Sequence, residues 1–196
     1  MENARTSLPP GNEFSRAYDR VGRAVMRLIA IIALLVSSCA TGPTTIRQVD
    51  FRNFEYTSSC TVTDEAIEVS NGVYRRHHLD FAVRQVVYGD LSGDGQEEAV
   101  VVARCNSGGT AWVTEGFIYG MKRGVPTLLA RIEGGDRADG GIVAVRIVKG
   151  RLQVDRYGTT GGYCCPEWIE TTTYRLEGPR LVEDGKRSRR PHTGGW

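Results

Sequence analysis

The chain has 196 residues, of which 40% are hydrophobic and 24% are charged, and its formal net charge is +2. These values are typical of a globular protein with one ordinary domain, and they exclude a chain that is disordered throughout. Within the expected domain, basic residues do not cluster with interleaved aromatic residues. The sequence therefore argues against nucleic acid as a partner.

The first element in chain order is a secretory signal. Three arginines within residues 20–27 precede an uninterrupted apolar run at residues 28–36, which is followed by two serines and Cys39. The run is too short to span a bilayer permanently, and this order of basic, apolar and small residues is typical of a signal peptide. Because Met26 followed by Arg27 makes a compact basic start for such a signal, we expect translation to begin at Met26.

Residues 36–39, Val-Ser-Ser-Cys, resemble the lipobox of bacterial lipoproteins. The resemblance implies that Cys39 is diacylated by chains such as palmitate, becomes the mature N-terminus and anchors the protein to the bacterial cell envelope. Ala40 after the cysteine implies the outer membrane if the cell is Gram-negative. The alternative is a buried helix with an incidental cysteine. Cleavage would remove five arginines and three acidic residues, which leaves a mature chain that is formally neutral.

From residue 49 onward, short β-branched runs alternate with glycine and asparagine, and no sustained helical periodicity occurs. Five hairpins are predicted, with strands at residues 67–69 and 73–75, 82–88 and 98–104, 112–121 and 127–133, 142–148 and 151–157, and 169–176 and 180–182. Strands joined by short turns usually pair as antiparallel neighbours. We therefore predict an all-β fold: an antiparallel meander of about eight to ten short strands, forming a sandwich or a partly open barrel stapled by disulfides.

The turn of the second hairpin is rich in oxygen side chains. Counting Asp90 as position 1, Ser92 stands at position 3, Asp94 at 5 and Glu98 at 9, and Gln96 offers its carbonyl at 7. Calcium prefers six to eight hard oxygen ligands, which a tight loop can bring together. An EF-hand is excluded, because position 12 is a valine in a strand.

The loop resembles the aspartate-rich calcium loop of FG-GAP repeats in integrin-type propellers, which also runs into a hydrophobic strand. The resemblance implies Asp90, Ser92, Asp94 and Glu98 as side-chain ligands of Ca²⁺. The alternative is a metal-free turn, in which Asp90 and Asp94 accept hydrogen bonds from N–H groups of their own loop. The sequence leaves both interpretations open.

Four cysteines remain beside Cys39, and they are Cys60, Cys105, Cys164 and Cys165. An even number of cysteines in an exported chain predicts disulfides. Because a bridge between adjacent cysteines is strained and rare, we expect Cys164 and Cys165 to bond to Cys60 and Cys105, in an order that the sequence leaves open. A zinc site is the less favoured alternative, since the chain has no Cys-x-x-Cys pair.

Most of the mature chain also resembles small bacterial lipoproteins and exported proteins of unknown function. Their segment of the type DLTGDGxxEA, downstream cysteine and late Cys-Cys-Pro motif correspond here to residues 90–99, Cys105 and residues 164–166. The resemblance implies the fold and the location, and it implies no activity.

The predicted organisation has four parts. Residues 1–38 are an N-terminal extension with the signal peptide, residues 39–48 a lipidated tether, residues 49–182 a single β domain, and residues 183–196 a basic disordered tail. Within the domain, Trp112, Phe117 and Tyr119 are expected in the core in preference to a ligand groove. The glycine-rich residues 134–141 are expected to form a flexible connection.

These features favour a lipid-anchored envelope β-domain with a structural, binding or interaction role, and calcium is a candidate stabilising ion. Its expected partners are the membrane, through the N-terminal lipid, and an envelope protein or glycan. The alternative is an envelope hydrolase that uses Asp90, Asp94, Glu97 or Glu98 in general acid–base catalysis. Carboxylates that project into a deep pocket would favour the enzyme, whereas carboxylates that converge on their own loop would favour the binding module.

Overall fold

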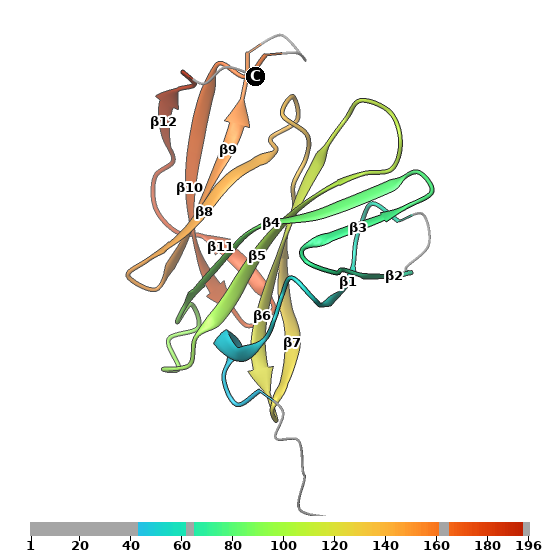
Figure 1. Ribbon diagram of the computed structural model, residues 1–196. Coiled ribbons are helices and arrows are strands. Elements are labelled where there is room, and N and C mark those ends of the chain that lie inside the picture. Colours follow the sequence, from blue (N-terminus) through green and yellow to red (C-terminus); the bar gives the residue numbers. More distant parts are fainter. Residues whose placement is uncertain (1–42, 62–64, 161–164, 194–196) are drawn as a thin grey trace, which may run out of the picture. The chain divides into compact units, whose positions relative to one another are not determined.

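The computed structural model describes residues 43–61, 65–160 and 165–193, which all belong to one compact unit spanning Gly42–Trp196 (Figure 1). The described residues form one short 3-10 helix and twelve strands, all paired antiparallel. They are η1 (Ile46–Gln48), β1 (Glu55–Thr57), β2 (Ala66–Glu68), β3 (Val73–Arg76), β4 (Leu79–Gly89), β5 (Glu98–Asn106), β6 (Val113–Lys122), β7 (Val125–Ile132), β8 (Ile142–Val148), β9 (Arg151–Gly158), β10 (Trp168–Glu177), β11 (Arg180–Glu183) and β12 (Ser188–Pro191).

The strands form two five-stranded sheets and one ribbon. Sheet I has the order β3-β4-β5-β6-β7, and sheet II has the order β11-β10-β9-β8, with β12 also paired to β10. The ribbon consists of β1 and β2. The described strands do not close into a barrel, so the predicted all-β antiparallel fold takes its sandwich form. β1 and β12 are the two strands that the sequence did not predict.

Four predicted hairpins are confirmed as β4–β5, β6–β7, β8–β9 and β10–β11. The turns at Arg123-Gly124 and Lys149-Gly150 have positive φ at both residues, which a two-residue hairpin turn of type I′ requires. The first predicted hairpin is only half right. Asn71 and Gly72 form such a turn, but beyond the single bridge between Ser70 and Val73 the chain diverges, and β2 and β3 pair with β1 and β4 instead.

Strand β5 lies in the centre of the molecule and is buried on both faces. Ala99, Val101 and Ala103 face a core on the side of the ribbon, whereas Val100 and Val102 face the core between the two sheets. A continuous apolar run, without polar alternation, is what a strand covered on both sides requires. The core between the sheets is completed by residues of sheet II such as Val145, Leu152 and Val154.

The ribbon and η1 cover the outer face of sheet I with an aromatic cluster. Phe54 and Tyr56 lie 5.2 Å apart by ring centroids, and Tyr56 lies 5.2 Å from Phe117. Phe117 and Tyr119 are buried as expected, whereas Trp112 is 38% exposed and stands outside this core. Ile46 of η1 is only 2% exposed. The domain therefore begins within the expected tether 39–48, because a residue of that segment packs into the core.

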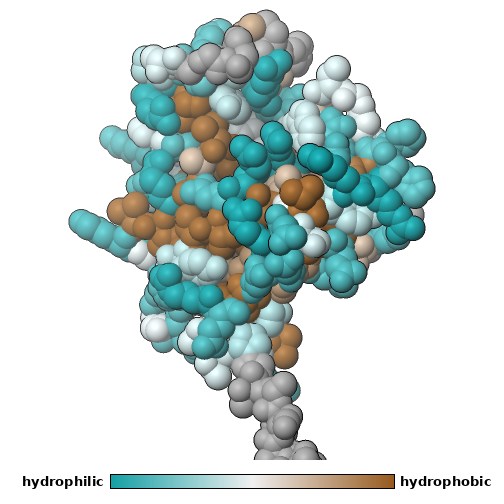
Figure 2. Space-filling view, viewed as in Figure 1, coloured by the Kyte–Doolittle hydropathy of each residue, from teal (hydrophilic) through white to brown (hydrophobic). Residues whose placement is uncertain are grey.

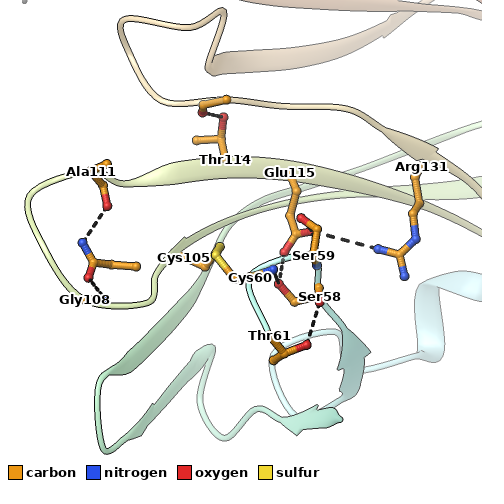
Figure 3. Close-up of a disulfide and its surroundings, with 12 residues drawn as sticks. Ser58, Ser59, Cys60, Thr61, Cys105, Gly108, Ala111, Thr114, Glu115 and Arg131 are labelled. Atoms are coloured by element: carbon orange, nitrogen blue, oxygen red, sulfur yellow. Dashed lines mark hydrogen bonds and ion pairs between the residues drawn. A yellow bond between two sulfur atoms is a disulfide. The ribbon is translucent and has the colours of Figure 1, made fainter. Parts of the chain in front are cut away.

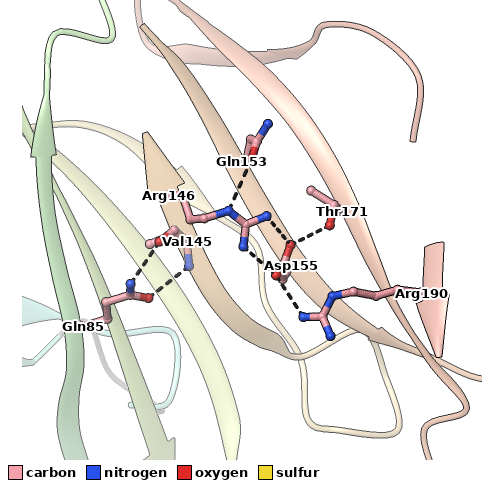
Figure 4. Close-up of polar contacts among 7 residues, drawn as sticks. All are labelled: Gln85, Val145, Arg146, Gln153, Asp155, Thr171 and Arg190. Carbon is pink, nitrogen blue, oxygen red and sulfur yellow. Dashed lines mark hydrogen bonds and ion pairs between the residues drawn. The ribbon is translucent and has the colours of Figure 1, made fainter. Parts of the chain in front are cut away.

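The expected disordered tail at residues 183–196 is wrong for residues 183–191, because β11 and β12 extend the free edge of β10. Figure 4 shows the reason: Asp155 of β9 accepts two hydrogen bonds from Arg146 at 2.8 and 3.0 Å, one from Thr171 at 2.6 Å, and one from Arg190 of β12 at 3.3 Å. Burial alone would raise the pKa of Asp155, but these hydrogen bonds outweigh it and hold that pKa below its usual value. The sequence suggests that the arginines at positions 187, 189 and 190 are solvated, but in the structure they pair with the half-buried Glu170 and the buried Asp155.

Candidate functional site

The acidic loop connects β4 to β5, and Glu98 closes it as the Cα partner of Gly89. The Glu98 side chain is buried at 4% exposure. Its Oε2 accepts hydrogen bonds from the backbone N–H groups of Leu91 at 2.7 Å and Ser92 at 3.2 Å. The carboxylate therefore points back into its own loop, where it supplies an acceptor to the buried N–H of Leu91.

The two aspartates of the loop behave in the same way. Asp90 accepts from the N–H of Gly93 at 2.6 Å and from the N–H of Gly95 at 3.0 Å. Asp94 accepts from the N–H of Gln96 at 2.8 Å. Gly93 and Gly95 have φ values of 79° and 85°, a left-handed conformation that favours glycine. This is the pattern expected of aspartates that stabilise a turn.

Glu97 takes a different partner from the other acids. Arg47 of η1 donates two hydrogen bonds to it, at 2.5 and 2.7 Å. The hydrogen bond from Arg47 is the main reason why the pKa of Glu97 is lowered. A carboxyl group with a lowered pKa is ionised at neutral pH, so Glu97 is unsuited to act as a general acid there.

Four of the five predicted calcium ligands lie along one wall of a hollow of about 550 Å³, whose other wall is formed by β6, β7 and the β10–β11 turn. Ser92, Asp94, Gln96 and Glu98 border this hollow, and Asp90 does not. In the parts of the chain that the structure describes, no group of three or more His, Cys, Asp or Glu side chains is placed to share a metal ion. Calcium binding by this loop stays a prediction.

The cysteine pairing differs from the expected one. Cys60 and Cys105 form a disulfide across 45 residues of sequence, with their Cα atoms 6.3 Å apart (Figure 3). The prediction that each would bond to Cys164 or Cys165 is therefore wrong. The loop after β1 crosses the end of β5, and this long-range contact leaves no trace in cysteine spacing. Cys165 is also disulfide-bonded, and Cys164 lies outside the described residues.

A buried glutamate holds the same loop beside the disulfide. Glu115 of β6 is 5% exposed, and its carboxylate accepts hydrogen bonds from the Ser58 hydroxyl and from the Ser59 N–H at 3.1 Å and hydroxyl at 3.0 Å (Figure 3). Arg131 of β7 lies 4.0 Å from Glu115. Ser58 is only 4% exposed, so this carboxylate and the serine groups bond to one another inside the protein, and the arrangement fixes the loop.

A second candidate site, which sequence reasoning missed, is a cleft of about 760 Å³ between one end of sheet I and β8. Its lining includes Arg84, Arg104, Trp112 and Tyr157. Arg104 follows Val100 and Val102 on the same face of β5, so the row of inward-facing residues changes from apolar to cationic. This change from apolar to cationic residues is the sequence signal that could have indicated the cleft. It can be interpreted only when this face of β5 is known to be turned toward a second sheet.

Exposed apolar residues do not mark a further site in the view of Figure 2, where hydrophobic residues reach the surface in separate areas among hydrophilic ones. Among the large hydrophobic residues that the structure describes, Val125 is the most exposed, at 59%, and it lies at the start of β7. Single exposed apolar residues are normal on a protein surface.

Comparison of the chain with family models, with curated proteins and with solved structures finds no match. Among the residues that the structure describes, none forms a helix with the length and apolar character needed to cross a membrane. Residues 1–42, which include Cys39 and the predicted signal, lie outside the described residues.

Proposed function

We propose that this chain is a lipid-anchored β-domain of the bacterial cell envelope with a binding or structural role and no catalytic role. The order of basic residues, apolar run and Cys39 supports the anchor. The Cys60–Cys105 disulfide supports an extracytoplasmic location, because disulfides persist in oxidising compartments and are rare in the cytosol.

The observation that carries the non-catalytic part is the direction of the loop carboxylates. Asp90, Asp94 and Glu98 accept hydrogen bonds from their own loop, and Glu97 is paired with Arg47. A general acid–base pair needs one carboxyl group free to donate a proton and another free to accept it, within reach of a bound substrate. These four carboxylates instead stabilise the turn and attach it to η1.

The partners of such a module are the membrane, through the lipid on Cys39, and an envelope protein or glycan. Calcium is a candidate ligand of the loop, with Asp90, Ser92, Asp94, Gln96 and Glu98 as its oxygen donors. The chemistry that calcium would supply is structural, since it would hold the turn that these residues already form.

The anchor is tested by the substitution Cys39→Ser, with Ser38→Ala as a control that keeps a small residue before the cysteine. We expect Cys39→Ser to move the protein from the membrane fraction to the soluble fraction and Ser38→Ala to leave it in the membrane. Mass spectrometry of the wild-type N-terminal peptide should find acyl chains on Cys39. An unmodified Cys39 thiol in wild-type protein from cells would refute the anchor.

The non-catalytic part has its own test. Purified protein is incubated with isolated cell-wall glycan, and soluble products are measured by mass spectrometry. We expect none above the buffer control. Products that the wild type releases and that Glu98→Gln or Asp94→Asn does not release would refute the proposal in favour of a hydrolase.

A further inference from the structure

One end of the space between the sheets remains open. Val100 and Val102 of β5 help fill that space with apolar side chains, but the next residue on this face is Arg104, and its Cα partner on β6 is Thr114. The cleft of about 760 Å³ lies here. A volume of this size is typical of small-molecule sites.

Two strand irregularities shape the cleft, one in each sheet. The pairing of β4 with β5 shifts between Val83 and Gln85, so that Arg84 has no Cα partner on β5. Arg84 and Gln85 both line the cleft. In a regular strand, neighbouring residues would point to opposite faces, whereas a bulge re-aims one of them. In sheet II, the pairing of β8 with β9 shifts between Ile142 and Ala144, and this segment forms the opposite wall.

Gln85 closes the cleft toward the apolar core. Its side-chain amide donates to the carbonyl oxygen of Val145 at 2.9 Å and accepts from the N–H of Val145 at 3.0 Å (Figure 4). This pair of hydrogen bonds joins the two sheets where the core between them ends. The bulge therefore uses one of its two residues to hold the sheets together and leaves the other, Arg84, on the open side.

The charge of the cleft is unbalanced. Arg84 and Arg104 have no carboxylate partner among the described residues, and the Nε of Arg104 is buried without a hydrogen-bond acceptor there. The acidic residue in the lining, Asp136, instead accepts from the N–H groups of Ala138 and Asp139 in its own loop, at 2.8 and 2.9 Å. A buried guanidinium nitrogen without an acceptor is unfavourable unless a ligand provides one.

Trp112 places a flat apolar surface beside these charges. Its ring lies 4.5 Å from the guanidinium carbon of Arg104, and the residue is 38% exposed. Val143 of β8 is also 38% exposed and lines the same cleft. Thr114 fixes the neighbouring loop, since its hydroxyl donates to the carbonyl oxygen of Gly135 at 3.0 Å and accepts from the N–H of Ile142 at 2.6 Å.

We propose that this cleft binds a small ligand that carries a carboxylate or phosphate group, with the anionic group between Arg84 and Arg104 and the body of the ligand against Trp112 and Val143. Guanidinium groups match the geometry of both oxyanions and form charge-assisted hydrogen bonds with them. The inference rests on the proposed function in one respect, because it gives the binding module a ligand class. It does not depend on the anchor at Cys39.

The test is calorimetric and fluorescence titration of the purified full-length protein in detergent. Glucuronate supplies a carboxylate, glucose 6-phosphate and inorganic phosphate supply the phosphate, and glucose is the neutral probe. We expect at least one sugar anion to bind and to change tryptophan fluorescence, and glucose to do neither. The comparison of glucuronate with glucose 6-phosphate decides which oxyanion the cleft prefers.

Arg84→Gln and Arg104→Met should each weaken binding about tenfold or more, which is the effect of losing one charge-assisted hydrogen bond. Arg180→Gln makes the same charge change on an exposed residue of β11 and should bind as the wild type does. Trp112→Phe should remove the fluorescence change, although Trp168 and Trp196 remain. If Arg104→Met does not fold by circular dichroism, Arg84→Gln, at an exposed position, decides the question alone.

Two results would overturn the proposal: no anionic probe binds at concentrations up to about 10 mM, or Arg84→Gln binds as tightly as the wild type and Arg180→Gln. Mass spectrometry of the probes after titration separates this inference from the proposed function. A probe that binds and is chemically converted would refute the non-catalytic role and leave the cleft as the binding site.

Discussion

Substitution of Glu98 tests how the acidic loop is held together. Glu98→Ala removes the acceptor for the N–H groups of Leu91 and Ser92, while Glu98→Gln keeps an oxygen at the same place and the same side-chain length. Leu91 is only 3% exposed, so in the native loop its N–H depends on the Glu98 carboxylate as its acceptor. The two variants therefore separate the loss of an acceptor from the loss of a charge.

The expected magnitudes follow from this geometry. A buried donor without an acceptor costs about 1–3 kcal/mol, and the truncation also leaves a void, so Glu98→Ala should lower the free energy of unfolding by about 3 kcal/mol. Replacing a charged acceptor by a neutral one should cost about 1 kcal/mol in Glu98→Gln. For a domain of this size, these values correspond to melting temperatures lower by roughly 6–12 °C and 2–4 °C.

The assay is thermal and urea unfolding of both variants and the wild type, in a chelator and in millimolar calcium. If hydrogen bonds alone hold the loop, the differences between the proteins will be the same in both solutions. If calcium binds, the wild-type melting temperature will rise with calcium by mass action, and Glu98→Gln will weaken that rise. A calcium-dependent rise that Glu98→Gln reduces would refute the metal-free account and establish the loop as a cation site.

Three further predictions concern stability. Replacing Cys60 and Cys105 together by serine should lower the free energy of unfolding by about 4 kcal/mol, because the disulfide closes a loop of 45 residues; an unchanged urea midpoint would contradict this. Asp155→Ala removes the shared acceptor of Arg146 and Arg190, which are half-exposed and can turn to water, so we expect a loss of about 2–3 kcal/mol. Hydrogen exchange should then show faster exchange in β12, and protection equal to that of the wild type would argue against this role. The lowered pKa of Asp155 also predicts acid sensitivity: its contribution is present above the unfolded pKa of about 3.9 and is lost as pH falls through the lower folded pKa. Wild-type stability should therefore fall more steeply than that of Asp155→Asn below about pH 4, and parallel curves would contradict this assignment.

Features that depend on neighbouring residues could be predicted from the sequence. Asn71-Gly72 adopts the positive φ values of a tight turn, because that preference belongs to the dipeptide itself. At Lys149-Gly150 the local signal is the glycine, which adopts φ 71° without a steric cost. The strands of four hairpins were predicted within a few residues, since alternation and β-branched composition are local signals. For the acidic loop, the alternative of aspartates bonded to their own loop describes the observed geometry, because these bonds span at most five residues.

Features that depend on which segments meet were decided by the tertiary structure alone. Cys60 bonds to Cys105 because the loop after β1 crosses the end of β5, a contact that four cysteines with three possible pairings cannot specify. Arg190 belongs to an ordered strand because a buried acid 35 residues earlier accepts its hydrogen bond. Arg104 reads in sequence as an ordinary polar residue at the end of a strand, and its place in a cationic cleft appears only when sheet II is packed against that face. Backbone preferences are properties of adjacent residues, whereas pairing, burial and clefts are set by the packing of two sheets, which no short segment encodes.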